Sequence, residues 1–296
     1  MVKFRIGRHI NVSLGLLTAP AYAKKLGCDI FQIFLGVPQR IISKPRRDED
    51  LIAFGKELEK QKLKMVVHGS YTINLCHPKK NKIFQTSVRS LVQDLNASAI
   101  IGKRCLGVII HMGKNIVANN LTNEQAINNY VYGLQTALAQ TPENTTIILE
   151  TGASQGTEVA SRIEGLSEIY WKLTDAERAR VKFCIDSCHI FASNYPISTP
   201  TGVKSFFKEF DTAIGIEQIA CIHFNDSKTK LGSKVDRHAD IGYGFIGIPG
   251  LKALAQFAEK HRIPIIFETP LDAVNSATNR DVTFVEELAK VKAWLK

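Results

Sequence analysis

Histidines and carboxylates recur at the ends of short apolar segments of this chain. Six segments end in a side chain that can bind a metal ion: His68, His111, Glu150, Asp186, His223 and Glu268. Their spacing of 36 to 45 residues is about the length of one strand–helix unit. A single histidine in such a place is usually a buried core residue, but six such ends are poorly explained that way. Because a carboxylate buried without a cation or hydrogen-bond partners is costly, we predict a metal centre.

Three further residues extend this set. His189 follows the segment that ends at Asp186, and Asp236 and His238 are two residues apart, so an extended loop directs both the same way. Each has a simpler explanation, since Asp186 could cap a helix and Asp236 could pair with Arg237. Together with the segment ends they give nine potential ligands, which is too many for one ion and enough for two or three.

The donor types indicate the metal and the reaction. Five histidines and four carboxylates, with no cysteine among them, suit zinc, with manganese or iron as possible substitutes. Two closely spaced ions are a common solution for phosphoester hydrolysis, because they activate water near neutral pH and absorb charge on the phosphoryl and leaving oxygens. The chain also has 38 Lys and Arg residues against 28 Asp and Glu, and this net charge of +10 favours a polyanionic partner.

Eight short apolar segments are predicted to be the strands that position these residues. They are Val2–Ile6, Ile30–Phe34, Leu63–His68, Cys105–His111, Thr146–Glu150, Val181–Asp186, Ile219–Phe224 and Ile263–Glu268. Several are continuous apolar runs rather than alternating ones, which is typical of parallel strands that are packed on both faces.

Helices are predicted between the strands. The segment from Thr18 to Gly27 has a cap candidate, an early proline and a terminating glycine, and Asp48 to Lys62 is charged on one side only. The helix Asn123–Gln140 follows a capping box of Thr122 with Gln125. The last helix, Thr283–Leu295, is predicted to begin with a second box of Thr283 and Glu286.

Strand and helix alternate eight times with no long linker or change of composition. This pattern predicts a (β/α)8 TIM barrel that forms a single domain over residues 1–296. A doubly wound open sheet would alternate in the same way. The barrel is favoured because it would bring the polar strand ends together at its C-terminal face.

Composition sets the class of protein. With 45% apolar and 22% charged residues the chain can bury a large core, and no apolar run is long enough to span a membrane. Residues 1–7 lack the features of a secretion signal, and the six cysteines form no C-x-x-C pair. We therefore expect an intracellular monomer of the cytoplasm or nucleus with free thiols and no membrane contact.

Several motifs resemble the endonuclease IV family of apurinic/apyrimidinic endonucleases. The matching segments, in the order of the family, are His68–Tyr71, Ile110–Gly113, Leu149–Thr151 with Gln155–Gly156, Cys184–His189, Ile222–Lys228 and Gly232–His238. The most specific are C-I-D-S-C-H, H-F-N-D-S-K and V-D-R-H. The similarity extends from Ile6–His9 to Phe267–Thr269, which is essentially the whole chain.

The resemblance implies a TIM barrel with three zinc ions that cleaves double-stranded DNA 5′ to abasic sites in base excision repair. It implies three ligand groups: His68, His111 and Glu150; the bridging Glu150 with Asp186, His223 and Glu268; and His189 with Asp236 and His238. Glu150 would thus be the catalytic bridging carboxylate. A hydroxide between the first two ions would attack phosphorus, and the third would stabilise the leaving 3′ oxygen. The products would be a 3′-hydroxyl and a 5′-deoxyribose phosphate.

Contacts to DNA are implied at two places. Tyr71 lies where the family has a tyrosine that inserts into DNA, although an aromatic packed on the barrel rim is the simpler reading. The family usually has arginine where this chain has Gln39, and Arg40 could take that role if the loop shifts by one residue. Thr72 is a second departure, since the family often places an apolar residue there.

Two alternatives remain open at this point. A divalent-metal sugar isomerase or epimerase of the same architecture could use Glu150, Asp186, His223 and Glu268, but it has no need for the other five ligands or for a basic surface. A basic nucleic-acid-binding protein without catalysis would use the charge alone, and nine intact ligands argue against it.

Overall fold

Eight parallel strands close into a barrel in the computed structural model, which describes residues 4–13, 15–270 and 280–295. The order around the barrel is β1-β10-β7-β6-β5-β4-β3-β2, and β1 pairs with both β10 and β2. The strands are β1 (Ile6–His9), β2 (Ile30–Ile33), β3 (Lys64–His68), β4 (Cys105–Ile110), β5 (Ile147–Glu150), β6 (Val181–Asp186), β7 (Ile219–His223) and β10 (Ile265–Phe267). This closure confirms the predicted barrel and excludes the open sheet.

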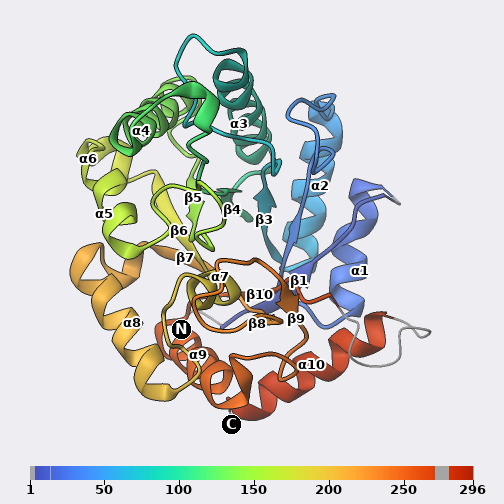
Figure 1. Ribbon diagram of the computed structural model, residues 1–296. Helices are drawn as coiled ribbons and strands as arrows, with labels where there is room; N and C mark the ends of the chain where they lie inside the picture. The colour runs from blue at the N-terminus through green and yellow to red at the C-terminus, as the bar shows by residue number, and fades with distance from the viewer. Residues whose placement is uncertain (1–3, 14, 271–279, 296) are drawn as a thin grey trace.

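Helices surround the barrel, as Figure 1 shows in a view along its axis. They are α1 (Ala19–Lys25), α2 (Asp48–Gln61), α3 (Lys82–Ile101), α4 (Asn123–Ala139), α5 (Ile163–Trp171), α6 (Asp175–Arg178), α7 (Ser187–Ala192), α8 (Pro200–Ala213), α9 (Gly247–His261) and α10 (Arg280–Trp294). A small antiparallel hairpin of β8 (Asp226–Ser227) and β9 (His238–Ala239) lies in the connection from β7 to α9.

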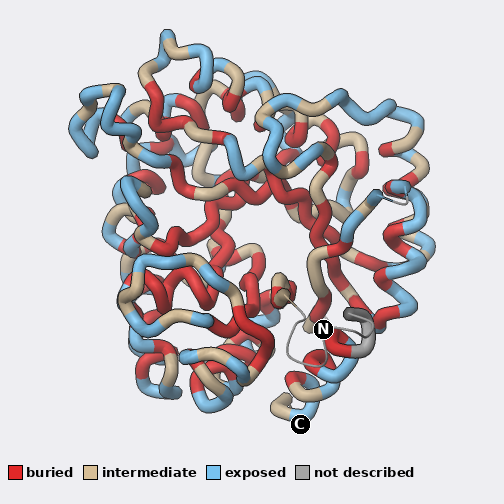
Figure 2. Tube along the Cα trace, turned by 45° about the vertical axis from the view of Figure 1, so that its right-hand side comes forward, coloured by how far each residue is buried: buried red, intermediate tan, exposed pale blue. Residues whose placement is uncertain are grey.

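Apolar side chains form two layers on either side of the barrel wall. One cluster lies inside the barrel and takes one fully buried residue from each of seven strands: Ile30, Val66, Ile109, Ile148, Cys184, Cys221 and Ile266. The larger cluster lies between the wall and the helices. Figure 2 shows the resulting pattern, in which buried chain surrounds the barrel and the outer faces of the helices are exposed. The inner cluster fills the barrel, so it forms a floor and not a pore.

The first strand is the one whose predicted position was wrong. The prediction was Val2–Ile6, whereas β1 begins at Ile6 and ends at His9; Val2 and Lys3 lie outside the described residues. The polar residues Arg8 and His9 interrupt the apolar pattern that the prediction followed. The other seven strands match to within two residues at each end, and His111 and Glu268 each lie one residue beyond their strands.

The predicted helices are found with two differences at their ends. The capping box of Thr122 and Gln125 is formed as predicted at the start of α4. Thr18 precedes α1 but makes no capping hydrogen bond, because its hydroxyl donates to the Gly15 carbonyl at 2.8 Å. Helix α10 already runs from Arg280, so Thr283 lies within it and is not its cap.

Two further expectations concern cysteines and membranes. All six cysteines are free thiols, and five of them are buried. Within the described ranges, no helix combines the length and the apolar character that crossing a membrane requires.

A buried glutamate holds α10 to the barrel. Glu287 is 4% exposed, and its carboxylate accepts hydrogen bonds from the Ile241 backbone N–H and the Thr269 hydroxyl, both at 2.7 Å. Burial raises the pKa of Glu287 to about 7, even though these two bonds favour the charged form. Folding therefore costs more free energy when this group must ionise.

We expect Glu287→Gln to stabilise the protein at pH 8 by roughly 2–3 kcal/mol, since each pKa unit corresponds to about 1.4 kcal/mol. The unfolded glutamate titrates near pH 4.3, so the wild-type carboxyl destabilises the fold increasingly as the pH rises from about 4.3 through about 7. Thermal unfolding of both proteins from pH 5 to pH 8 measures this. Glu286→Gln changes the exposed neighbour and serves as the control. A stability difference between Glu287→Gln and wild type that does not grow as the pH rises would contradict the raised pKa of Glu287.

Candidate metal centre and nucleic-acid face

The candidate ligands form a second layer of side chains directly above the apolar floor of the barrel. Side chains two residues apart on a strand point the same way. Six strand-end residues each follow a floor residue by two positions and therefore also point inward: His68, His111, Glu150, Asp186, His223 and Glu268. The alternation of the strands thus turns the six predicted ends into one polar layer.

The nine predicted ligands fall into three adjoining groups whose donor atoms lie within 4.8 Å of one another. They are His68, His111 and Glu150; Glu150, Asp186, His223 and Glu268; and His189, Asp236 and His238. These are the three groups that the resemblance implied. Glu150 belongs to two of them, and it is 1% exposed.

Glu150 lies between histidines on both sides. Its Oε2 is 3.3 Å from Nε2 of His68 and 3.6 Å from Nε2 of His111. Its Oε1 is 3.0 Å from Nδ1 of His223, and the same nitrogen is 3.0 Å from Oε2 of Glu268. One carboxylate therefore faces two neighbouring sites with its two oxygens.

The third group comes from α7 and from the hairpin. The Asp236 carboxylate lies 3.2 Å from Nε2 of His189 and 3.2 Å from Nε2 of His238. Arg237 does not compete for this carboxylate, because its Nη1 donates to the backbone carbonyl of Asp236. The predicted common orientation of Asp236 and His238 is therefore found, and the simpler pairing with Arg237 is not.

Asp186 caps a helix with one carboxylate oxygen and faces the candidate ligands with the other. Its Oδ1 accepts a hydrogen bond from the His189 backbone N–H at 2.8 Å and caps α7. Its Oδ2 faces the ligand groups, 3.8 Å from Nδ1 of His223 and 3.6 Å from Nε2 of His238. The neighbouring Cys188 lies close enough to Asp186 and His238 to form a further possible group, but burial raises the pKa of its thiol to about 12.

Hydrogen-bond acceptors behind four histidines fix which ring nitrogen is free. The Nδ1 atoms of His68 and His189 face the backbone carbonyls of Gly69 and Thr151, both at 2.8 Å, and Nδ1 of His238 faces the Glu268 carbonyl at 3.2 Å. In His223 the order is reversed, because Nε2 faces the side-chain carbonyl of Gln32 at 2.8 Å. An imidazole that donates from one nitrogen presents a lone pair on the other, and here that nitrogen faces the carboxylates.

Three ring nitrogens of the ligand groups are buried without a hydrogen bond, and two of them face the Asp236 carboxylate at 3.2 Å. Among the described residues, Nε2 of His111, His189 and His238 have no hydrogen-bond partner. Buried polar atoms without partners are rare in folded proteins, and a binding site for an ion is one of the recognised reasons for them. All three belong to the ligand groups, so the donor set fits divalent cations.

The electrostatics of the centre are set by burial and by mutual attraction. Burial alone would raise the pKa of Glu150, but the histidines beside it, chiefly His111 and His223, hold that pKa well below its ordinary value. Burial would lower the pKa of His238, but Asp186 and Asp236 raise it to about 9. Glu150 is thus kept ionised by the positive charge of its neighbours, whereas burial raises the pKa of Asp186.

Two positioning residues were missed in the sequence. Gln32, on β2, donates to Oε1 of Glu268 at 2.6 Å while it accepts from His223. Asn225 donates to Oδ2 of Asp186 at 2.8 Å, and its side-chain oxygen accepts from the Glu268 backbone N–H at 3.0 Å. Gln32 is the polar residue within the apolar run I-F-Q-I-F, a signal that was available. Asn225 lies inside a quoted motif but received no role.

Tyr71 stands at the mouth of the centre and is 52% exposed. Its ring makes an edge contact with His68, at 5.3 Å between centroids, and lies 5.2 Å from Phe34 and 5.5 Å from His111. One side of the ring thus packs on the rim, as the simpler reading expected, and the other side is open to solvent. This position is compatible both with insertion of Tyr71 into DNA and with simple packing on the barrel rim.

The loop with Gln39 and Arg40 is fixed beside Tyr71, because the Pro38 carbonyl accepts from the Tyr71 backbone N–H at 3.0 Å. Both Gln39 and Arg40 are exposed. Arg40 borders a hollow of about 560 Å³ that Lys82 and Arg89 also line, together with Ile41, Ile42, Ile83 and Thr86. Three cationic residues and no acidic one border this mostly apolar hollow, and which of Gln39 and Arg40 would contact DNA stays a prediction.

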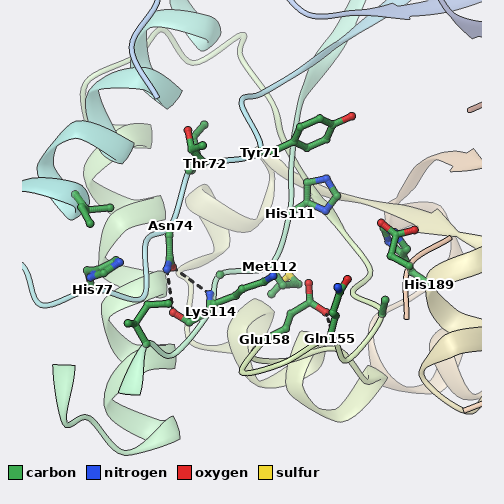
Figure 3. Close-up of a pocket in the computed structure, with 16 residues that line it drawn as sticks. Tyr71, Thr72, Asn74, His77, His111, Met112, Lys114, Gln155, Glu158 and His189 are labelled. Atoms are coloured by element: carbon green, nitrogen blue, oxygen red, sulfur yellow. Dashed lines mark hydrogen bonds and ion pairs between the residues drawn. The ribbon is translucent and has the colours of Figure 1, made fainter. Parts of the chain in front are cut away.

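A pocket of about 390 Å³ opens beside the first and third groups, and His111, His189 and Asp236 form part of its lining. Figure 3 shows Tyr71 at its upper edge and the Lys114 side chain running toward Met112 and Glu158. The Asn74 side chain fixes the Lys114 backbone on both sides. Its oxygen accepts a hydrogen bond from the Lys114 N–H at 3.1 Å, and its amide nitrogen donates to the Lys114 carbonyl at 2.9 Å. The pocket therefore places an ammonium group near the candidate metal centre.

Comparisons with known proteins agree with this architecture. A family model described as a xylose isomerase-like TIM barrel matches residues 20–294. A protein assigned as endonuclease 4 from Acanthamoeba polyphaga mimivirus is 67% identical over 99% of this chain and 94% of that protein. One with the same assignment from Nitrosopumilus maritimus is 34% identical over 90% of this chain and 94% of that protein.

Solved structures give the same result. The crystal structure of endonuclease IV from Thermus thermophilus matches with a TM-score of 0.80 and 28% identity and covers 98% of both chains. A D-tagatose 3-epimerase-like protein matches with a TM-score of 0.68 and 13% identity over 98% of this chain and 97% of that one. At that identity the second likeness concerns the fold alone.

We expect Gln32→Leu to weaken metal retention about 10- to 100-fold, which is typical for loss of a residue that orients ligands. The leucine would leave Nε2 of His223 without its acceptor and Glu268 without its donor. Competition with a coloured chelator, followed by metal analysis, measures the affinity. Gln61→Leu, on the outer helix α2, is the matched control. Unchanged retention in a folded Gln32→Leu protein would show that Gln32 does not orient these ligands.

Proposed function

Because the chain belongs to the endonuclease IV family, we propose that it is a zinc-dependent DNA-repair endonuclease that hydrolyses the phosphodiester 5′ to abasic sites. The products would be a 3′-hydroxyl and a 5′-deoxyribose phosphate. The observation that carries this proposal is the convergence of nine nitrogen and oxygen donors into three adjoining groups beneath an exposed tyrosine. A net charge of +10 supports a polyanionic substrate.

Three zinc ions would fit the three groups, with manganese or iron as possible substitutes. His68, His111 and Glu150 would hold the first, and Glu150 would be shared with the second. Divalent cations held there would lower the pKa of water and neutralise charge that develops on the phosphoryl and leaving oxygens. The three buried nitrogens without hydrogen bonds support this fit from the side of the protein.

The residues around the ligands would orient the ligands and exclude water from beneath the centre. Gln32 and Asn225 connect ligands from the ends of β6, β7 and β10, so the positions of Asp186, His223 and Glu268 depend on one another. The apolar floor beneath them keeps water from the underside of the centre. A fixed arrangement of donors of this kind needs little reorganisation during the reaction.

Recognition of DNA would fall to the rim. Tyr71 would enter the base stack beside the missing base, where an abasic nucleotide loses no stacking when it turns outward. The pocket next to it would receive that nucleotide, with Lys114 near a phosphate and Asn74 fixing the lysine backbone. Arg40, Lys82 and Arg89, which border the neighbouring hollow, would contact the phosphate backbone of the DNA.

The sugar isomerase or epimerase is the weaker interpretation. It would use the group of Glu150, Asp186, His223 and Glu268 and would leave the other five donors without purpose. A binding protein without catalysis would have no reason to keep any of the three groups. Incision of an abasic duplex, tested beside isomerisation of simple sugars, separates the three possibilities.

The bridging carboxylate provides the first test of the proposal. We expect close to three zinc ions per chain in the wild-type protein, and we expect Glu150→Gln to lower incision by more than about a hundredfold with the fold intact. An amide has one neutral acceptor oxygen and bridges two cations poorly. Elemental analysis, circular dichroism and a gel assay on an abasic duplex measure the three quantities.

Glu143→Gln changes an exposed glutamate and serves as the control. Near-normal turnover by Glu150→Gln with its metals retained would remove Glu150 from this role. Active wild-type protein that holds one weakly bound magnesium ion, or no metal, would contradict the three-zinc assignment.

Tyr71 provides a second test that concerns recognition and not chemistry. We expect Tyr71→Ala to reduce the preference for abasic over intact duplex by about 1–3 kcal/mol, the usual value for stacking of a base on an aromatic ring. The dependence of affinity on salt should hardly change, because no phosphate contact is lost. Binding of both duplexes across a salt series measures this. Tyr71→Phe should keep the preference, and an unaltered preference in Tyr71→Ala would leave Tyr71 as a rim-packing residue.

A further inference from the structure

Two aromatic rings are exposed on the loop that joins β9 to α9. Tyr243 is 62% exposed and Phe245 is 53% exposed, although neither was noted in the sequence. The loop follows His238, a candidate ligand, and a connection from a barrel strand to the next helix lies at the C-terminal face. The rings are therefore on the same face of the barrel as the candidate metal centre.

The loop that carries them is fixed by a single buried carboxylate. Asp226 is fully buried and accepts hydrogen bonds from the backbone N–H groups of Gly242, Gly244, Ile246 and Gly247, at 2.9 to 3.3 Å. A Cβ atom at position 244 would lie 2.4 Å from the Ser227 carbonyl and 2.5 Å from Oδ1 of Asp226. Only glycine permits this approach of the loop to the carboxylate.

The remaining N–H groups of the loop are also bonded. The Ile241 N–H donates to Glu287, that of Tyr243 to the Asp240 carbonyl at 3.0 Å, and that of Phe245 to the Ser227 carbonyl at 2.8 Å. Each of the seven consecutive N–H groups from residue 241 to residue 247 thus has an acceptor. These bonds fix the backbone of the loop, and more than half of the surface of Tyr243 and of Phe245 is exposed to solvent.

A rigid exposed ring binds with little loss of conformational entropy, which is why tyrosine is favoured at recognition surfaces. Lys290 adds positive charge, since its Nζ lies 5.2 Å from the centre of the Tyr243 ring and donates to the Ile241 carbonyl. Aromatic rings next to cations suit the faces of nucleobases, and stacking of this kind is largely independent of sequence.

The distance from the centre limits what can reach these rings. Tyr243 follows His238 by five residues, and with about 3.8 Å between successive Cα atoms their Cα atoms are at most about 19 Å apart. One strand of DNA advances about 3.4 Å per nucleotide, so DNA cut at the centre passes the rings within about six nucleotides. Paired bases hide their faces in the stack, so the rings can stack only on unpaired ones.

We propose that Tyr243 and Phe245 form a stacking surface for unpaired nucleotides within about six positions of the scissile bond, so that abasic sites beside single-stranded segments are favoured substrates. This inference rests on the proposed function. It names a substrate feature that the metal centre alone does not select. The occupant is nucleic acid and not a partner protein, because DNA is the molecule that the adjacent centre would bring within reach.

The test compares two kinds of abasic duplex. One is fully paired. The other has a mismatched segment of five nucleotides that begins three base pairs from the abasic site, and this segment is placed on the 5′ side in one substrate and on the 3′ side in another. Binding and incision are measured for the metal-loaded wild type and for Tyr243→Ala, Phe245→Ala and the double variant. We expect the wild type to prefer the partly unpaired substrate five- to tenfold for one placement. Each single variant should reduce this ratio, and the double variant should bring it close to one.

A fluorescent base gives a readout that does not depend on activity. 2-Aminopurine in the mismatched segment should be quenched by the wild type through stacking, and this quenching should be lost in the double variant. Phe245→Tyr should retain it. Trp171→Ala removes an exposed ring at the end of α5, away from the C-terminal face, and should leave both the ratio and the quenching unchanged.

A wild-type ratio of one for both placements, or a ratio that the double variant does not alter, would overturn the proposal. Self-association that is lost in the double variant while the DNA ratio persists would also overturn it and would assign the rings to a protein contact. Incision of the fully paired duplex by the wild type supports the proposed function whatever the ratio. Failure to incise any abasic DNA would contradict the proposed function itself.

Discussion

The alternation of side chains along parallel strands is the constraint on which the rest of this molecule depends. One inward position per strand forms the apolar floor, and the position two residues later forms the layer of donors above it. A buried layer that contains the three carboxylates Glu150, Asp186 and Glu268 is strongly unfavourable unless positive charge lies within it. The neighbouring histidines meet part of this need, and the ligand groups could hold cations that meet the remainder. Barrel closure therefore brings the donors together and also buries their carboxylates, which then need positive charge beside them.

The orientation of the histidines connects parts of the chain that are distant in sequence. Gln32 lies on β2, yet it determines which nitrogen of His223 on β7 is free and where the Glu268 carboxylate lies beyond β10. The Glu268 backbone in turn accepts from His238 on the hairpin. Since these contacts join elements that are not paired with each other in a sheet, a shift of register in one strand would misplace ligands on others. The geometry of the donors is thus a property of the closed barrel and not of any single motif.

The strand ends could be predicted from the sequence because chemistry and spacing coincide there, whereas the division of the candidate ligands into three groups came from the resemblance. Each of the six ends follows an apolar run, and that run is itself the signature of a parallel strand. The shift of β1 was missed because Arg8 and His9 interrupt its apolar character, and the start of α10 was misplaced because Thr283 with Glu286 imitates a capping box. Gln32, Tyr243 and Phe245 were overlooked because their importance depends on which elements become neighbours. The local sequence marks Gln32 as a polar residue in an apolar run, but it does not show which ligands Gln32 contacts or which face Tyr243 and Phe245 lie on.

The third ligand group differs from the other two in the part of the fold that supplies it. Asp236 and His238 come from the β8–β9 hairpin and not from the barrel wall, and their side chains are 37% and 19% exposed, whereas Glu150 is 1% exposed. The hairpin is not part of the barrel wall, so the third group depends on a connection that the other two groups do not use. If each group holds an ion, as proposed, a chelator would reach the ion of the third group more readily than the ions beside the buried Glu150.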